Sequence, residues 1–374
     1  MAGIYLHIPF CKQACHYCNF HFSTSLKGKQ DFLESLLIEI ELRQDYLEGE
    51  SVDTIYFGGG TPSLLLPAEL NLILSKIYKC FPISQGAEIT FEANPDDVFY
   101  DGAIAWKAAG INRLSMGVQS FYEDDLKWMN RAHTAGQALN SIKTVQDAGF
   151  DNITIDLIYG SPSLTDAKWE HNVQQAIGLG IPHLSCYALT VEPRTALATM
   201  IEKHRSPPVH SEDQARQFLL LMDWLHKVGY LHYEISNFAK PGMHSRHNSA
   251  YWSGKSYIGF GPSAHSYNGS TRQWNVANNS RYIQSLTQGQ LPFEIEHLTA
   301  RDKQNEFVMI SLRRNEGISK KQFAISFGPA AVSALTKSIN KHIISGAVVE
   351  DEVAFSLTRE GKLFADGIAA DLFI

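Results

Sequence analysis

The sequence predicts an α/β protein: a partial (β/α)6 barrel of the TIM type, followed by a small, mostly helical, winged-helix-like domain. From Ile4 to about Ala239, short β-branched and aromatic runs alternate with longer segments of helical period. That alternation is typical of parallel strands joined by crossover helices. From about Thr299 helical segments return and precede a predicted hairpin. We therefore expect a barrel over 1–239, a loop-rich segment over 240–298 and a C-terminal α+β domain over 299–374.

Six strand-helix units form the predicted barrel, and its active site should gather in the loops at the carboxyl ends of the strands. The predicted strands are Ile4–Ile8, Thr54–Phe57, Glu88–Glu92, Arg113–Val118, Asn152–Ile158 and His183–Leu189, with His232–Ile235 as a further candidate. The predicted helices are Gln30–Leu47, Ala68–Cys80, Ala135–Ala148, Asp166–Leu179 and Ser211–Val228.

The remaining segments differ in texture from the barrel. Residues 241–278 are rich in Gly, Ser, Asn and aromatic residues with little helical period, which predicts a loop-dominated surface or cap. Nothing in the charge pattern of the last domain indicates DNA binding, so a packing or partner-docking role is expected. Its predicted elements are helices over Arg301–Leu312, Lys320–Phe327 and Ala330–Ser345, a hairpin over Val348–Leu357 and a helix over Arg359–Ala369.

Composition excludes several classes of protein. The chain has 374 residues, 44% hydrophobic and 19% charged, with 32 basic and 39 acidic side chains for a net charge of −7. This excludes a largely disordered chain and argues against nucleic-acid binding. The longest apolar run, Leu64–Leu74, is interrupted by Pro67 and Glu69, so no transmembrane helix is predicted. With no secretory signal either, we expect a cytoplasmic protein. Cys80 and Cys186 stand alone and are expected to be structural.

Three cysteines, Cys11, Cys15 and Cys18, crowd into the loop after the first strand. A structural zinc site takes four ligands, which His16 or His21 could complete here. A cubane iron–sulfur cluster on three thiolates instead leaves one iron open to a substrate or cofactor. The spacing of four and three residues favours the cluster.

The Cys-x-x-x-Cys-x-x-Cys spacing resembles the signature of radical S-adenosylmethionine (radical SAM) proteins. This resemblance implies that the open iron is chelated by the amino and carboxylate groups of S-adenosylmethionine. It also implies reductive cleavage of that cofactor to methionine and a 5′-deoxyadenosyl radical, chemistry that belongs to the cofactor rather than the protein. Tyr17, between the last two thiols, would pack beside the cofactor.

Further polar or flexible residues follow the next strands. The run Gly58-Gly59-Gly60-Thr61-Pro62 lets the backbone approach a ligand, although a tight turn alone would also use it. The carboxylates among these residues could accept hydrogen bonds from ribose hydroxyls of a ligand. The other polar side chains could hydrogen-bond to a carboxylate or amide of the ligand. The alternative is that these residues cap strand ends and pair with one another. The strand-end residues are Glu92, Gln119 and Asp156, with Arg131 added from the following loop.

From Tyr5 through Asp156 and on to the carboxyl end, the chain resembles the branch that holds oxygen-independent coproporphyrinogen III oxidase and its HemW-like heme-chaperone relatives. The oxidase has a fourth cysteine two residues after the third, where this chain has Phe20, and an amino-terminal extension where this chain has ten residues before Cys11. Both departures favour the chaperone side. The resemblance implies S-adenosylmethionine contacts at Tyr5, Gly59, Gly60, Thr61, Glu92, Gln119, Arg131 and Asp156.

The stretch His247-Asn-Ser-Ala-Tyr251-Trp252 resembles the His-Asn-x-x-Tyr-Trp motif of the heme-chaperone subgroup. A histidine can be an axial ligand of heme iron, and Tyr and Trp offer flat apolar faces to a porphyrin. The same residues could instead pack a loop onto the barrel. His244 and His265 are competing ligands, so the sequence leaves the heme ligand open.

The resemblance thus implies a heme chaperone that holds a 4Fe-4S cluster and S-adenosylmethionine, carries heme as cargo and delivers it to respiratory-chain proteins. A homodimer and a peripheral membrane contact are both compatible with it. The alternative is an enzyme of porphyrin metabolism, the oxygen-independent coproporphyrinogen III oxidase, which decarboxylates two propionates oxidatively. Whether this chain is an enzyme stays open at this point.

Overall fold

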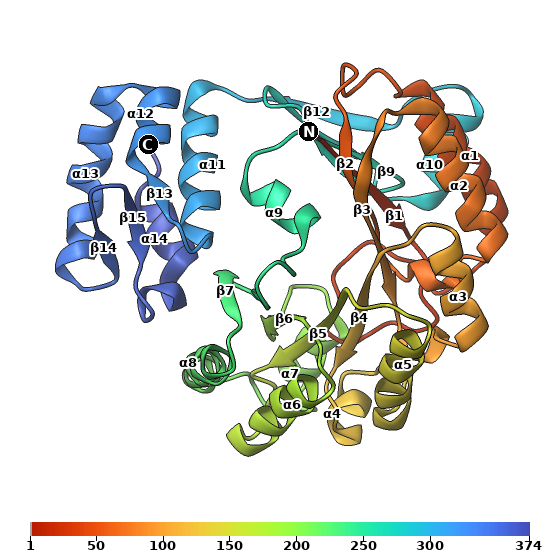
Figure 1. Ribbon diagram of the computed structural model, residues 1–374, viewed down its shortest axis with the longest axis horizontal. Helices are drawn as coiled ribbons and strands as arrows, with labels where there is room; N and C mark the ends of the chain where they lie inside the picture. Colours follow the sequence, from red (N-terminus) through yellow and green to blue (C-terminus); the bar gives the residue numbers. More distant parts are fainter. Residues whose placement is uncertain (1) are drawn as a thin grey trace.

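The computed structural model, which describes residues 2–374, places one long curved sheet at the centre of the molecule (Figure 1). Within that range the sheet has twelve strands in the order β12-β11-β10-β9-β1-β2-β3-β4-β5-β6-β8-β7. Strands β1 to β6 are consecutive and parallel, and β9 pairs in parallel with β1. Antiparallel strands extend the sheet beyond β9 and beyond β6. The two end strands, β12 and β7, do not meet, so the barrel is partial and open, as predicted.

The first six strands lie where the sequence predicts strands, and the sheet contains further strands. They are β1 (Ala2–Ile8), β2 (Val52–Gly59), β3 (Ile83–Ala93), β4 (Arg113–Gln119), β5 (Ile153–Tyr159), β6 (His183–Ala188), β7 (Leu231–Glu234), β8 (Asn237–Ala239), β9 (Tyr257–Phe260), β10 (His265–Tyr267), β11 (Thr271–Asn275) and β12 (Phe293–His297).

Helices connect most of these strands, and five of them lie where a helical period predicts a helix. They are α1 (Lys29–Leu42), η1 (Pro62–Leu64), α2 (Pro67–Cys80), η2 (Pro95–Asp97), α3 (Tyr100–Ala108), α4 (Glu123–Trp128), α5 (Ala135–Asp147), α6 (Asp166–Gly178), α7 (Ala196–Glu202), α8 (Ser211–Lys227), α9 (Arg246–Trp252) and α10 (Asn279–Thr287).

Successive side chains of a strand point to opposite faces of the sheet, and this period decides where the polar residues go. Ile4 and Leu6 of β1 are fully buried in the core shared with the surrounding helices. Tyr5, between them, points to the other face and pairs in register with Tyr56 of β2. In Figure 1, α1, α2, α3 and α5 cover the convex side of the sheet, and α9 lies within its concave side. The inner face therefore carries the polar side chains.

The expectation that residues 241–278 are loop-dominated is wrong. This segment holds α9 and the strands β9, β10 and β11, and β9 pairs in parallel with β1. These strands are only three to five residues long, too short for a strand period to stand out. The partner of β9, β1, lies about 250 residues earlier in the chain. The three-part division of the chain at 239/240 and 298/299 stays a prediction.

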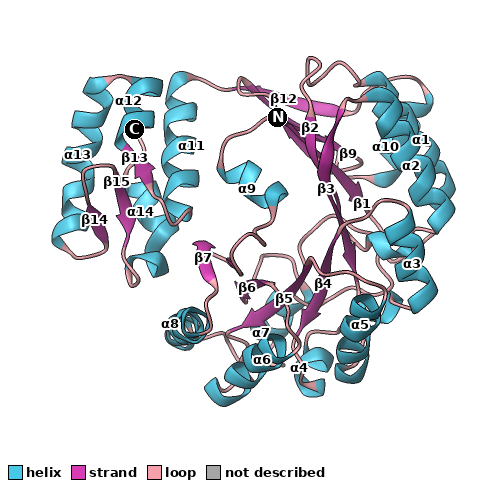
Figure 2. Cartoon of the chain, viewed as in Figure 1, coloured by secondary structure: helices cyan, strands magenta, loops and turns pink. Residues whose placement is uncertain are grey.

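The C-terminal part has its own apolar core and a three-stranded sheet of order β13-β15-β14 (Figure 2). Arg313 bridges it to the barrel: its carbonyl accepts from Ile235 N (3.0 Å), and its guanidinium lies 5.1 Å from the ring centre of Trp252. The helical, winged-helix-like character is confirmed. Its elements are α11 (Ala300–Arg313), β13 (Ile318–Ser319), α12 (Lys320–Phe327), α13 (Pro329–Ile344), β14 (Val348–Glu350), β15 (Ala354–Leu357), η3 (Gly361–Phe364) and α14 (Ala365–Asp371).

Among the helices of residues 2–374, none combines the length and the apolar character that crossing a bilayer requires.

Candidate functional site

The three clustered thiols lie on the loop that leaves β1 at its carboxyl end. The loop is closed at its base, where Cys11 N donates to Ser23 O (3.0 Å) and Ser23 N donates to Pro9 O (2.9 Å). Cys11, Cys15 and Cys18 are half-buried and unpaired with one another. Burial raises the pKa of Cys11 to about 11, against a hydrogen bond with Thr61, and also raises the pKa of Cys18. Their ionised forms therefore call for a cationic partner such as iron.

The turn between α4 and α5 packs against the thiol loop and holds it in place. Asn130, in the left-handed region with φ 57°, donates to Ala14 O (2.7 Å) and accepts from Gln13 Nε2 (2.8 Å). His16 N donates to Met129 O (3.0 Å). These contacts fix the loop between the first and last cysteine.

The histidines that could complete a zinc site are both engaged elsewhere. His16 Nδ1 is hydrogen-bonded to Trp128 O (2.8 Å), and His21 Nε2 is hydrogen-bonded to Asn279 Oδ1 (2.7 Å). Over residues 2–374, no three His, Cys, Asp or Glu side chains lie close enough together to ligate one metal ion.

Arg131 joins the thiol loop to two barrel strands. Its Nη1 donates to Cys15 Sγ (3.3 Å), and its Nη2 donates to Asn94 Oδ1 (2.8 Å) and Gly117 O (2.7 Å). Its buried Nε has no hydrogen-bond partner within residues 2–374. A half-buried cation with a buried, free donor next to a thiol is suited to an anionic group such as a ligand carboxylate. This arrangement fits a cluster and its bound cofactor.

Gly59 and Gly60, at and just after the end of β2, are each required for a different steric reason. A Cβ on Gly60 would lie 2.6 Å from the carbonyl oxygens of Ile8 and Phe10, the residues that lead into the thiol loop. Gly59 has φ 99°, and its Cβ would meet the His7 ring at 2.5 Å. The Gly60 contact shows that the glycine turn and the thiol loop are packed backbone to backbone.

Two half-buried carboxylates, Glu92 and Asp156, lie on the inner face. Tyr56 donates its hydroxyl to Glu92 Oε1 at 2.7 Å. Burial raises the pKa of Glu92 to about 7, the Tyr56 hydrogen bond opposes that rise, and Asp156 adds to it. Burial likewise raises the pKa of Asp156 to about 6, against a hydrogen bond with Ser185. Both carboxyl groups can accept hydrogen bonds from ligand hydroxyls, and a pH above about 7 favours their ionised forms.

The other expected cofactor contacts surround these groups. Gln119 ends β4 in the left-handed region with φ 67°, a strained conformation for a non-glycine residue. Tyr5 stacks on Tyr56 with ring centres 6.1 Å apart, and Thr61 Oγ1 accepts from Asn94 Nδ2 (3.2 Å). Tyr17 packs against the apolar cluster of Met129, Ile158, Leu189 and Leu197. The roles of these residues toward a cofactor stay predictions.

His247 of the expected heme motif lies inside the protein, with 2% of its surface exposed. Hydrogen bonds join its Nδ1 to Thr54 Oγ1 (2.8 Å) and its Nε2 to the Tyr251 hydroxyl (3.1 Å). Burial lowers its pKa to about 3. Either nitrogen would have to give up a hydrogen bond to ligate iron, so the heme-contact prediction for this residue requires a local rearrangement.

The remaining residues of that prediction are more accessible. Trp252 and Tyr251 are half-buried, and His265 is exposed on β10. His244 stacks on Tyr233 with ring centres 4.3 Å apart, and its buried Nε2 has no hydrogen-bond partner in the described part of the chain. His244 and His265 thus keep their place as competing heme ligands.

Sequence reasoning missed Tyr56 and Asn94, which contact the predicted site residues directly. Tyr56 sits inside a strand and reads as core, and Asn94 sits between Ala93 and Pro95 and reads as a turn. The inward period of β2 was the available signal for Tyr56, because it shares a face with Thr54 and Gly58.

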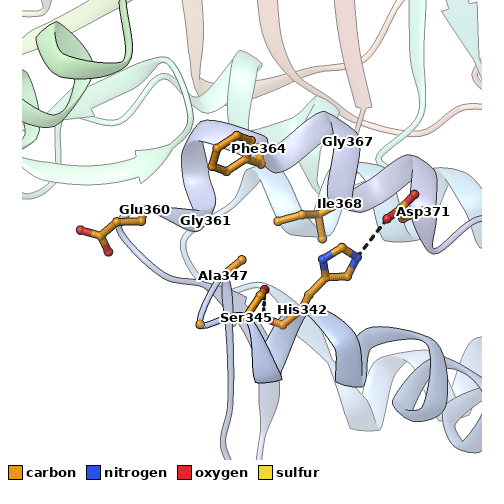
Figure 3. A pocket seen from close by; sticks show the side chains of 10 residues that line it. His342, Ser345, Ala347, Glu360, Gly361, Phe364, Gly367, Ile368 and Asp371 are labelled. Atoms are coloured by element: carbon orange, nitrogen blue, oxygen red, sulfur yellow. Dashed lines mark hydrogen bonds and ion pairs between the residues drawn. The ribbon is translucent and has the colours of Figure 1, made fainter. Parts of the chain in front are cut away.

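Two pockets lie away from this site. One, of about 530 Å³, is in the C-terminal part between α13 and α14 (Figure 3), where the His342 ring faces Asp371 (Nε2 to Oδ2, 3.4 Å). The other, of about 480 Å³, lies at the amino ends of β3 and β4 beside Tyr78 and Asn112. None of the predicted site residues lines either pocket.

Comparison with known proteins assigns parts of the chain to known domain families. Residues 5–176 match the family model of the radical SAM superfamily, and residues 298–364 match the HemN C-terminal domain. The structure of coproporphyrinogen III oxidase (HemN) from Escherichia coli superposes with a TM-score of 0.86 at 24% identity, covering 100% of this chain and 90% of that one. At that identity the likeness shows the fold.

The curated relatives are similar over their full length. The chain is 35% identical over 372 residues to the heme chaperone HemW of Bacillus subtilis (strain 168), covering 98% of each protein. It is 33% identical over 381 residues to the heme chaperone HemW of Escherichia coli (strain K12), covering 100% of this chain and 98% of that one. The radical SAM fold, the C-terminal domain and this full-length similarity together show that the chain belongs to the HemW heme chaperone family.

Proposed function

We propose that this protein is a heme chaperone that binds heme, carries a 4Fe-4S cluster with S-adenosylmethionine and delivers heme to respiratory-chain proteins. The observation that carries the proposal is the full-length similarity to heme chaperones, at 35% identity over 98% of the chain. Cys11, Cys15 and Cys18 would hold the cluster.

The buried polar groups around the thiol loop support the cofactor part of the proposal. Arg131, with its unpartnered Nε, would face the carboxylate of S-adenosylmethionine, and Glu92 and Asp156 would accept hydrogen bonds from its ribose. When bound, the cluster and S-adenosylmethionine supply one-electron reductive chemistry. The chain's own part is to orient the cofactor and to keep water from it. Tyr5, Tyr17, Gly59, Gly60, Thr61 and Gln119 complete the proposed contacts.

Heme would be held near the His247–Trp252 motif, with the faces of Tyr251 and Trp252 against the porphyrin. His247, His244 and His265 are the proposed iron ligands to be compared. The acceptors would be heme-requiring respiratory proteins, met in the cytoplasm or at the membrane surface, and the chaperone could act as a homodimer.

An anaerobic heme titration of cluster-reconstituted protein, followed by absorbance, tests the proposal. The wild type is compared with His247→Ala, His244→Ala and His265→Ala, and the same preparations are supplied with reductant, S-adenosylmethionine and coproporphyrinogen III. Saturable heme binding without decarboxylation is expected, and the variant that loses the heme spectrum identifies the ligand. Formation of protoporphyrinogen IX without heme binding would make the chain a coproporphyrinogen oxidase and overturn the proposal.

A further inference from the structure

The short helix α9 occupies the concave face of the sheet rather than an outer surface (Figure 1). Its first turn is fixed on β3, because Glu88 accepts from Arg246 N (3.1 Å) and His247 N (3.0 Å). Gly3 of β1 leaves room for it, since a Cβ there would lie 3.0 Å from Thr54 Oγ1 and 3.4 Å from His247 Cε1. The helix therefore packs against β1, β2 and β3 with His247, its buried residue, at the centre of the contact.

His247 is clamped on three sides by neutral partners. Thr54 and Tyr251 engage its two ring nitrogens, and its ring stacks on Tyr56 with centres 4.9 Å apart and planes 26° apart. A histidine held in this way has one orientation. Its flat face in turn restricts the ring of Tyr56 to one position.

The fixed Tyr56 ring in turn fixes the position of the Glu92 carboxylate. Its hydroxyl donates to Glu92 Oε1 at 2.7 Å. The space between them is kept by Gly58, where a Cβ would lie 2.8 Å from the Tyr56 ring and 3.1 Å from Glu92 Oε1. The first glycine of the Gly-Gly-Gly run is thus required by the Tyr56–Glu92 contact.

We propose that His247 and Tyr56 are positioning residues of the S-adenosylmethionine site, with His247 fixing the Tyr56 ring so that the Tyr56 hydroxyl holds the Glu92 carboxylate ready for the cofactor. This inference rests on the proposed function, since it takes Glu92 as a cofactor contact. It gives the His-Asn-x-x-Tyr-Trp motif a task at the cofactor site that is independent of heme ligation.

The test measures S-adenosylmethionine affinity by anaerobic calorimetry on cluster-reconstituted protein at pH 6.5, 7.5 and 8.5. The variants are Tyr56→Phe, which removes the hydroxyl and keeps the ring, His247→Ala, and the double variant. Tyr267→Phe on β10, three strands from β2, is the matched control. Iron and sulfide content and heme affinity are measured on the same preparations.

Tyr56→Phe is expected to weaken S-adenosylmethionine binding about ten-fold, the usual effect of losing a hydrogen bond to a charged group. The loss should be larger at pH 6.5 than at pH 8.5, because the Tyr56 hydroxyl favours the ionised form of Glu92. The other titratable groups near Glu92 are Tyr5, Asp156 and Tyr187, and all of them stay in place in this variant.

His247→Ala should change affinity in the same direction, and the double variant should lose no more than Tyr56→Phe alone, because the histidine acts through the tyrosine. Iron and sulfide content should match the wild type in all variants. Wild-type affinity with an unchanged pH profile in both single variants would overturn the inference. Wild-type protein that binds no S-adenosylmethionine would overturn the cofactor part of the proposed function, and this inference with it.

Discussion

At the scale of the single residue, Cys15 is the thiol most closely tied to the rest of the site. It lies between Cys11 and Cys18 and accepts a hydrogen bond from Arg131 Nη1 at 3.3 Å. Cys15→Ser is predicted to lose the cluster, because two thiolates cannot hold a cubane securely. Iron and sulfide analysis after anaerobic reconstitution checks this. Cys80→Ser, at the end of α2, is the matched control and should reconstitute fully.

Retention of wild-type iron and sulfide in Cys15→Ser would contradict the assignment of the three thiols. An equal loss in the Cys80→Ser control would instead show that any cysteine substitution impairs reconstitution.

Motifs and family resemblance could predict which residues belong to the site. They could not predict which residues hydrogen-bond to them. The sequence pointed to Glu92 and Arg131, yet it gave no sign that Tyr56 and Asn94 hold them. Those contacts join residues 36 and 37 positions apart. They depend on strand register, which local spacing does not encode. His247 shows the same limit, since its motif is visible in sequence and its burial against β2 is not.

At the scale of elements, the turn after β2 and the thiol loop after β1 form one packed unit. Gly60→Ala is predicted to disrupt it, because the new methyl group would lie 2.6 Å from two backbone oxygens that cannot move without shifting the loop. Cluster content after reconstitution should fall to less than about half of wild type while the far-ultraviolet circular dichroism is kept. Gly178→Ala at the end of α6, where a Cβ meets nothing within 4 Å, is the control. Full cluster loading in Gly60→Ala would show that the two turns are not coupled.

A second contact between elements is a buried ion pair that ties α1 to β9, to the turn after β9 and to α10. Glu39 accepts from Arg43 Nη1 (3.0 Å), from the Tyr282 hydroxyl (2.6 Å) and from Gly261 N (2.8 Å), and Arg43 also donates to Gly259 O (2.9 Å). Glu39→Ala should lower the free energy of unfolding by about 3–5 kcal/mol, because it leaves the Arg43 charge buried without its partner.

Urea denaturation followed by circular dichroism measures that change. Glu34→Ala on the exposed side of the same helix is the matched control, and its effect should stay within about 0.5 kcal/mol. A loss of less than about 1 kcal/mol in Glu39→Ala would mean that the pair does not hold the segment to the barrel.

These contacts also explain which elements the sequence could predict. Helices of clear period follow β1, β2, β4, β5 and β6, so the alternation exposes most of these strands. No helix separates β9, β10 and β11, and β9 is placed by its pairing with β1 and by the Arg43–Gly259 contact. Nothing within residues 241–278 encodes those distant partners.

At the scale of the whole molecule, neutral histidines buried between elements join its parts. His183 is hydrogen-bonded to Thr154 Oγ1 (3.1 Å) and to the Tyr233 hydroxyl (2.7 Å), which links β5, β6 and β7. His232 is hydrogen-bonded to Ile235 O (3.1 Å) and to Lys362 Nζ (3.2 Å), which links β7 to the C-terminal part. Breaking these links by protonation would loosen several elements at once.

Acid should therefore destabilise the fold before it reaches the ordinary range of carboxylates. Burial lowers the pKa of His7 and His133 to about 4 and of His232 and His247 to about 3, and it lowers that of His183 as well. Below about pH 6.5 the histidines of the unfolded chain become protonated, whereas the buried histidines of the folded chain stay neutral. The free energy of unfolding therefore falls as the pH drops from about 6.5 toward 4.

Glu92 and Asp156 act in the opposite direction, because their raised pKa values of about 7 and about 6 let the folded state bind protons first. Burial raises the pKa of Asp97 and Glu234 in the same direction, and it lowers the pKa of His244 and His265 as well. With seven such histidines against four such carboxylates, the histidines should dominate. Urea midpoints of the cluster-free protein at pH 7.5, 6.5, 5.5 and 4.5 should decline at each step below 6.5. Each histidine contributes up to about 1.4 kcal/mol per pH unit. His232→Gln should flatten the decline relative to the exposed control His204→Gln. A midpoint that rises between pH 6.5 and 5.5 would show that the carboxylates of raised pKa outweigh the histidines and that the buried imidazoles are not what limits acid stability.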